Sequence, residues 1–178
     1  MNRTPEYFVP LARWLHWLMA VLLLAMLFIG AGMVASVSER HEWLLHLHKP
    51  LGIAILALAL LRLAVRLGTR QPPLPADLAK PQALAAKASH WLLYGLMLLL
   101  PVLGWAMISA AGDPVMLSES LRLPALLPAD ASTFALLRRA HGYLAYLLFL
   151  TVLVHLAAAL YHGLIRRDGV LRSMVGPK

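Results

Sequence analysis

Eight histidines occur in a chain of 178 residues that is 61% hydrophobic and has no cysteine. An imidazole can bind a metal ion, transfer a proton or join two helices by a hydrogen bond. Four of the eight lie within or at the edge of long apolar stretches: His16, His48, His141 and His155. Ionisable groups are costly in such surroundings and usually mark function. For one histidine alone an interhelical hydrogen bond is the simplest interpretation, so the arrangement of the four decides between these chemistries.

The apolar stretches predict an integral membrane protein. Only 13% of the residues are charged, which leaves too little polar surface to cover a soluble globule of this size. A helix needs roughly 20 apolar residues to cross a hydrocarbon core of about 30 Å. Four segments approach or exceed that length, at about residues 14–38, 44–65, 88–109 and 140–165. We therefore expect an all-α fold, an integral membrane four-helix bundle, formed by a single domain over residues 1–178.

The connections and ends of these segments contain no catalytic motif that we recognise. Residues 71–81 are rich in proline, and residues 112–133 form a longer polar connection. Pro101 lies within the third segment, where it removes one backbone hydrogen bond and is expected to kink the helix. Arg62 and Arg66 lie near the end of the second segment, where their long side chains can extend to the membrane surface.

The distribution of basic residues predicts the orientation of the segments. With four spans both termini lie on one side, and cytoplasmic loops carry an excess of Lys and Arg. The side of the termini has 11 basic residues: Arg3, Arg13, Arg62, Arg66, Arg70, Lys80, Lys87, Arg166, Arg167, Arg172 and Lys178. The other side has 5: Arg40, Lys49, Arg122, Arg138 and Arg139. We expect both termini in the cytoplasm, and no nucleic-acid binding, because the net charge of +8 is spread over the segment ends.

A cleaved signal peptide is an alternative interpretation of the first apolar segment. A basic start precedes the segment, and small residues occur around Val34, Ala35 and Ser36. The segment is longer than the usual apolar region of a signal peptide. We therefore expect it to remain as a membrane-spanning helix.

The spacing of the histidines places them at two depths in the membrane. His141 and His155 are 14 residues apart, which returns them to nearly the same helix face at a separation of roughly 21 Å. The first helix runs outward and the fourth runs inward, so His16 and His155 both fall toward the cytoplasmic side. The second helix also runs inward, so His48 and His141 both fall at the periplasmic side. Two depth-matched pairs result.

These two pairs predict two haem groups. Paired neutral imidazoles above and below a flat macrocycle form a low-spin haem site that is suited to electron transfer. One metal ion cannot bind ligands roughly 21 Å apart on one helix, and the lack of cysteine excludes a covalently attached c-type haem. His41 and His46 lie close to His48, which leaves the choice of the outer ligand open, and Pro50 restricts the backbone beside it.

Several motifs resemble the small bacterial cytochrome b-561 family, in order and over nearly the whole chain. They are RWLHW at 13–17, HKPLGI at 48–53, RLAVRL at 62–67, HWLLY at 90–94, LPVLGW at 100–105, HGYLAY at 141–146, HLAAALYHGL at 155–164 and LRSM at 171–174. The resemblance implies a di-haem cytochrome of the bacterial inner membrane. In it His16 and His155 would bind the cytoplasmic haem, and His48 and His141 the periplasmic haem.

The family includes superoxide oxidases, which pass electrons from periplasmic superoxide to ubiquinone. The resemblance therefore implies two b-type haems as cofactors, superoxide as the donor and ubiquinone as the acceptor. Positive charge that can attract an anion lies beside the outer ligands, at Lys49, Arg138 and Arg139. Near the cytoplasmic haem, His90 and His162 can hydrogen-bond a quinone carbonyl and relay a proton.

Two other functions stay open from the sequence. The family is also related to the haem-carrying membrane subunits of hydrogenases and dehydrogenases, which receive electrons from a docked redox partner. A helical transporter or scaffold would have no redox role. Transporters usually contain broken helices or repeats around a central site, and this sequence shows neither.

Overall fold

The computed structural model describes residues 5–35, 37–116 and 121–177. Of the residues used above, Arg3, Ser36 and Lys178 lie outside these ranges. The described residues form four helices that are long and apolar enough to cross a membrane, and this confirms the number expected from hydropathy. They are α1 (Pro10–Val34), α2 (Glu39–Gly68), α3 (Lys80–Ala110) and α4 (Ala131–Leu160).

The helices differ in their bounds from the apolar segments that predict them. Helix α1 ends at Val34, whereas the apolar segment runs to residue 38, and α3 and α4 begin well before residues 88 and 140. Hydropathy marks the part of a helix that can lie in lipid, and polar residues at its ends extend the helix beyond that part. Helices α2 and α3 continue through Pro50 and Pro101.

The connection predicted for residues 112–133 is more ordered than the sequence indicates. It contains two short antiparallel strands, β1 (Val115–Met116) and β2 (Arg122–Leu123), in an otherwise helical fold. The start of α4 also falls within it. Asp130 caps this helix, because its carboxylate accepts hydrogen bonds of 2.7 Å from the Ser132 hydroxyl and the Thr133 backbone N–H. These bonds lower the pKa of Asp130 to about 2.

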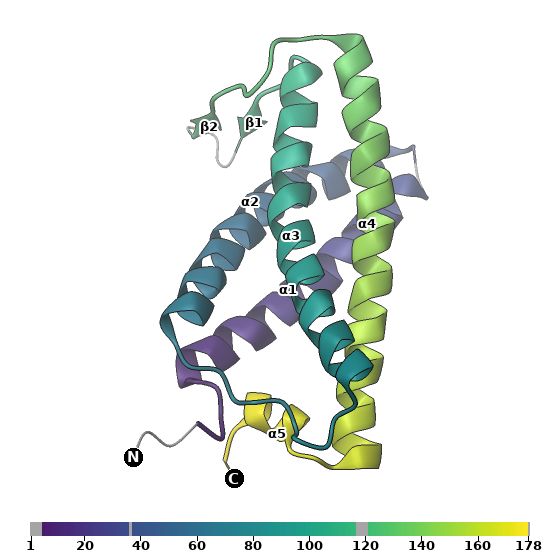
Figure 1. The fold of residues 1–178 in the computed structure, drawn as a ribbon. Helices are drawn as coiled ribbons and strands as arrows, with labels where there is room; N and C mark the ends of the chain where they lie inside the picture. Colours follow the sequence, from purple (N-terminus) through teal and green to yellow (C-terminus); the bar gives the residue numbers. More distant parts are fainter. Residues whose placement is uncertain (1–4, 36, 117–120, 178) are drawn as a thin grey trace.

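The chain crosses the bundle four times within the described residues, and both termini lie at the same end (Figure 1). Helix α1 packs on α2, α2 on α3, and α3 on α4. Among the long helices, α4 packs its backbone closely against α3 alone in the described part of the chain. The backbone of α4 therefore lies farther from α1 and α2 than from α3. Histidine side chains span that distance, His155 toward His16 in α1 and His141 toward His48 in α2.

The C-terminal segment closes the end of the bundle where the termini lie (Figure 1). A π-helical turn, η1 (Tyr161–Arg166), follows α4 and leads to the short helix α5 (Val170–Val175). Three hydrogen bonds attach α5 to the start of α1. The Phe8 backbone N–H donates to the Ser173 carbonyl, the Arg13 guanidinium to the Val175 carbonyl and the Trp17 indole to the Met174 carbonyl.

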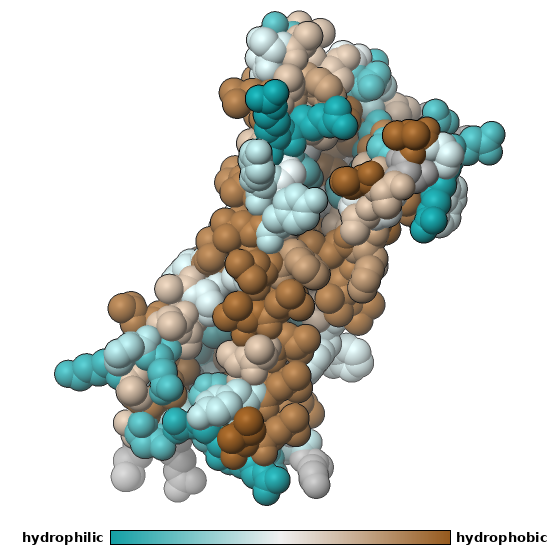
Figure 2. Space-filling view, turned by 90° about the vertical axis from the view of Figure 1, so that its right-hand side faces the viewer, coloured by the Kyte–Doolittle hydropathy of each residue, from teal (hydrophilic) through white to brown (hydrophobic). Residues whose placement is uncertain are grey.

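The core lies where the four helices face one another. Met19 from α1, Ala59 from α2, Leu96 from α3 and Leu148 from α4 are all buried in one apolar cluster. The remaining apolar side chains largely face outward, and Figure 2 shows an apolar band with polar residues gathered toward the two ends. This distribution suits a surface that lies in lipid.

Met19 is fully buried at 0% exposure, whereas Val21 on the same helix is 65% exposed. We expect Met19→Ala to destabilise the protein by about 2–5 kcal/mol, because the buried cavity cannot be refilled. The measurement is the thermal unfolding midpoint of the purified protein in detergent. Val21→Ala is the matched control and is expected to leave the midpoint nearly unchanged. Equal midpoints for the two variants would contradict this assignment of the core.

Candidate functional site

One pair of histidines joins α2 to α4 near the end of the bundle that lies away from the termini. The ring centroids of His48 and His141 are 6.1 Å apart. The Nδ1 atoms of both rings are buried without a hydrogen-bond partner in the described part of the chain. The His141 ring approaches the Leu100 carbonyl, but the geometry falls short of a hydrogen bond. Buried polar atoms without a partner are rare and call for an explanation.

The separation of the His48 and His141 rings fits a metal centre held between them. Two metal–nitrogen bonds of about 2.0 Å, with the ring radius added on each side, give a centroid distance of about 6 Å. An interhelical hydrogen bond, which is the simplest alternative for a lone histidine, is not formed by either ring among the described residues. The arrangement therefore favours ligation over a purely structural role.

Two glycines allow these rings to lie close to neighbouring helices. A Cβ atom added at Gly104 in α3 would lie 3.3 Å from Cε1 of His141. At Gly30 in α1 it would lie 3.9 Å from Cε1 of His48. The first distance is tighter than an ordinary contact, so the glycine at position 104 preserves the space that the His141 ring occupies.

The structure separates His48 from its two neighbours in the sequence. The Nδ1 atom of His41 donates a hydrogen bond of 2.9 Å to the Met33 carbonyl, which ties His41 to the end of α1. His46 is exposed on α2. Of these three histidines, His48 is the one whose ring faces His141.

A second group of histidines lies toward the end of the bundle that carries the termini. The ring centroids of His16 in α1 and His155 in α4 are 6.2 Å apart, which matches the outer pair. His90 in α3 lies even closer to His155, at 5.5 Å. The sequence predicted His90 as a quinone-binding residue near this level, and the structure packs it directly against the inner pair. No group of three metal-ligating side chains that could hold one ion occurs among the described residues.

An arginine contacts the inner pair, which sequence reasoning missed. The Arg62 guanidinium lies 2.9 Å from Nδ1 of His16, so it points into the bundle, although its position in α2 predicted extension to the membrane surface. Spacing along one helix gives the depth of a residue, but not the neighbour that its side chain meets on another helix. The RLAVRL motif is the signal that could have indicated this contact.

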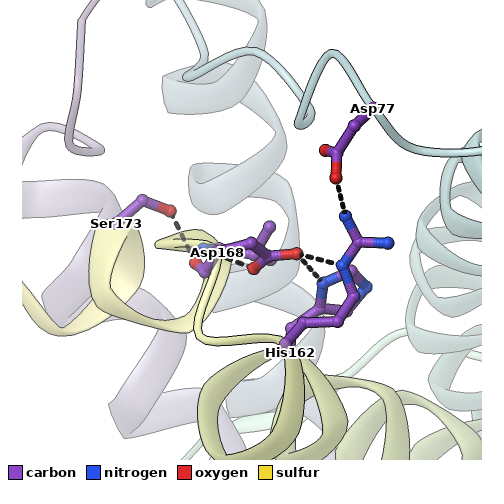
Figure 3. A network of polar contacts seen from close by, with 6 residues as sticks. Asp77, His162, Asp168 and Ser173 are labelled. Carbon is purple, nitrogen blue, oxygen red and sulfur yellow. Dashed lines mark hydrogen bonds and ion pairs between the residues drawn. The ribbon is translucent and has the colours of Figure 1, made fainter.

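His162 belongs to a polar network beyond the end of α4 (Figure 3). Its Nδ1 atom donates to the Asp168 carboxylate over 2.6 Å, and the Arg166 Nε–H donates to the same oxygen over 2.9 Å. Arg166 also donates to Asp77 in the connection before α3, over 2.7 Å. Because a carboxylate only accepts, Nδ1 of His162 carries the proton and Nε2 remains available as an acceptor.

Asp168 is ionised at neutral pH. Desolvation raises the pKa of this carboxyl, but hydrogen bonds from His162, the Val170 backbone N–H and Arg166 outweigh it and hold the pKa below its usual value. The network therefore keeps its anion throughout the physiological range. Sequence reasoning did not select Asp168, and the indication available was one acidic residue directly after two arginines.

The basic residues predicted to lie around the outer pair differ in their exposure. Lys49 is half-buried beside His48, whereas Arg138 and Arg139 are exposed. The two arginines line a shallow groove along the side of α4 together with Tyr143 and Tyr146. Arg139 is two residues before His141, so it lies on a different side of the helix. Lys49 is not among the residues that line this groove.

Comparison with known proteins adds to this geometry. Residues 7–177 match the family of prokaryotic cytochrome b561. The chain is 32% identical over 180 residues to cytochrome b561 homolog 2 of Escherichia coli (strain K12), an alignment that covers 98% of this chain and 94% of that protein. It is 28% identical over 169 residues to the probable superoxide oxidase CybB of Yersinia pestis, with 92% and 93% covered.

The space beside His141 can be tested with two glycines of the same helix. We expect Gly104→Val to displace the His141 ring and lower the haem bound per chain, because overpacking costs about 1–3 kcal/mol, which corresponds to about 5- to 150-fold in affinity. The measurement is haem per chain after titration of the purified protein. Gly95→Val is the control, since a Cβ at Gly95 meets nothing within 4 Å. Full haem binding by both variants would show that the His141 ring does not need this space.

Proposed function

Because the chain belongs to the prokaryotic cytochrome b561 family, we propose that it is a superoxide:ubiquinone oxidoreductase carrying two b-type haems. Family membership supports a b-type haem and membrane electron transfer. The proposal of two haems, one toward each membrane surface, is supported by two histidine pairs toward opposite ends of the bundle. His48 faces His141 at 6.1 Å, and His16 faces His155 at 6.2 Å.

Helix α4 contributes one histidine to each pair and so sets the distance between the two levels. His141 and His155 lie on one continuous helix, roughly 21 Å apart along its axis. Bound haem supplies one-electron redox chemistry at each level. His48 with His141, and His16 with His155, would hold the haems, and the two rings of each pair already lie at a separation that suits this role.

The outer pair is the proposed point of entry for electrons. Superoxide is an anion that gives up one electron and leaves as molecular oxygen, so positive charge near the entry raises its local concentration. Lys49 beside His48, and Arg138 and Arg139 on α4, supply such charge. The name of the relative from Yersinia pestis, probable superoxide oxidase, supports this choice of donor.

The inner end is the proposed site of quinone reduction. A quinone takes up two electrons and two protons to form a quinol, so two superoxide anions are oxidised for each quinol formed. His162 suits the role of a proton relay, because Asp168 holds its Nδ1–H (Figure 3) and leaves Nε2 to accept a proton and pass it on to a quinone oxygen. His90, which packs against His155, is a second group that can hydrogen-bond a carbonyl at this level.

The charge distribution supports an inner-membrane location with both termini in the cytoplasm. The starts of α1 and α3 and the ends of α2 and α4 lie at the end of the bundle that holds the termini (Figure 1). In the sequence, Arg13, Arg70 and Lys80, together with Arg166 and Arg167, are at or next to these helix ends. An excess of basic residues on one side is typical of the cytoplasmic face. Superoxide would then be oxidised at the periplasmic side and protons for the quinone drawn from the cytoplasm.

The proposed activity can be tested with the purified, haem-loaded protein in detergent. With ubiquinone present, we expect it to consume superoxide faster than spontaneous dismutation, to reduce its haems and to form quinol. A variant with His48→Ala and His141→Ala is expected to lose this activity. Superoxide consumption no faster than dismutation would reject the proposal. Haem reduction that requires a co-purifying dehydrogenase or hydrogenase would indicate a cytochrome subunit instead.

A second prediction separates the inner end from the outer end. We expect His162→Gln to leave superoxide-driven haem reduction intact and to slow haem reoxidation by quinone by about 10²-fold, because a general acid contributes on that order. The measurement is stopped-flow absorbance of pre-reduced protein mixed with quinone. His46→Gln changes an exposed histidine outside both pairs and is the control. Unchanged reoxidation in His162→Gln would remove this residue from the quinone site.

A further inference from the structure

Two arginines lie one turn apart on the part of α2 that faces the inner histidines. The guanidinium carbons of Arg62 and Arg66 are each 5.7 Å from the ring centre of Tyr94, a buried residue of α3. Arg66 also lies 6.0 Å from the Trp91 ring. Both side chains are partly buried in a helix that is apolar enough to cross a membrane. Charges in such a position usually pair with an anion.

Neither arginine pairs with a carboxylate among the residues that the structure describes. The ion pairs found there join Asp77 and Asp168 to Arg166, at the far side of the C-terminal turn. The face of an aromatic ring attracts a cation, but it does not neutralise the charge. Two adjacent positive charges beside the inner histidines therefore lack an anionic partner from the described part of the chain.

The contact between Arg62 and His16 constrains the chemistry of His16. A guanidinium is always protonated and can only donate, so Nδ1 of His16 must accept this hydrogen bond. A neutral imidazole that accepts at Nδ1 carries its proton on Nε2. A histidine that binds iron through Nε2 has the opposite arrangement, with its proton on Nδ1. The Arg62–His16 bond and ligation through Nε2 therefore exclude each other.

We propose that Arg62, assisted by Arg66, binds a propionate carboxylate of the inner haem, and that this exchange of partner frees His16 to bind the iron. A b-type haem carries two propionate groups. A guanidinium binds a carboxylate through two parallel, charge-assisted hydrogen bonds, which are stronger than a bond to a neutral imidazole. The inference rests on the haem-binding part of the proposed function and is independent of superoxide and quinone.

The test compares haem b with its dimethyl ester, in which both propionates are uncharged. The full-length protein without haem is titrated with each porphyrin, and binding is followed by the Soret absorbance. We expect the wild-type protein to bind the ester about tenfold more weakly, the size typical of a charge-assisted bond. Arg62→Met retains Arg66 and is expected to lose most of this preference. The outer pair is the same in both proteins, so the difference between them reports the inner site.

Two further variants serve as a control and as a replacement for Arg62→Met. Arg70→Met removes an exposed cation beyond the end of α2 and is expected to retain the wild-type preference. Arg62→Gln keeps an uncharged hydrogen-bond donor on a shorter side chain and replaces Arg62→Met if the latter does not fold. The midpoint potential of the bound haem is a second readout, and loss of a nearby positive charge is expected to lower it.

The outcomes distinguish this inference from the function on which it rests. An undiminished preference for haem b in Arg62→Met or Arg62→Gln would overturn the role of Arg62. Equal binding of the two porphyrins by the wild-type protein would do the same, although the haem sites would stand. A wild-type protein that binds no haem b would reject the proposed function itself.

Discussion

The structure depends on pairs of imidazoles that face each other between helices in an apolar environment. Helix α4 packs its backbone on α3, and its histidines reach across to α1 and α2. In lipid no water compensates a polar atom, so each ring needs a partner within the bundle. Gly104 follows from the same constraint, because a larger residue there would crowd the His141 ring.

The two levels differ in their electrostatic surroundings. The outer rings of His48 and His141 make no hydrogen bond within the described residues, whereas Arg62, Arg66 and His90 crowd the inner pair. Positive charge near a redox centre stabilises its reduced form. If the proposed inner haem is bound, Arg62 and Arg66 would stabilise its reduced form, which agrees with the proposed flow of electrons from the outer side to the inner side.

The turn after α4 holds a histidine that a carboxylate orients. The π-helical turn η1 holds His162, and the carboxylate of Asp168 from the following segment orients it. π-helical turns are rare and are often found at functional sites. Arg166 connects the turn to Asp77 before α3, so the segment is held on two sides. In this position Nδ1 of His162 is held by Asp168, and Nε2 remains available for a further hydrogen bond.

The sequence alone determined the number of membrane-crossing helices and the depth of each histidine. Both depend on local properties, namely the length of apolar segments and the 3.6-residue repeat that puts His141 and His155 on one face. The structure brings together the same pairs that depth predicted, while their binding of haem stays a proposal. Helix bounds could be predicted less well, because hydropathy marks lipid contact and not the end of a helix.

Only the tertiary structure decided which neighbours the side chains meet. The choice of His48 over His41 and His46, and the contact of Arg62 with His16, depend on the rotation of one helix against another. The same holds for Asp168 and His162, which meet because the chain turns back after α4. Sequence spacing specifies position along a helix axis, but it contains no information on the direction in which the next helix lies.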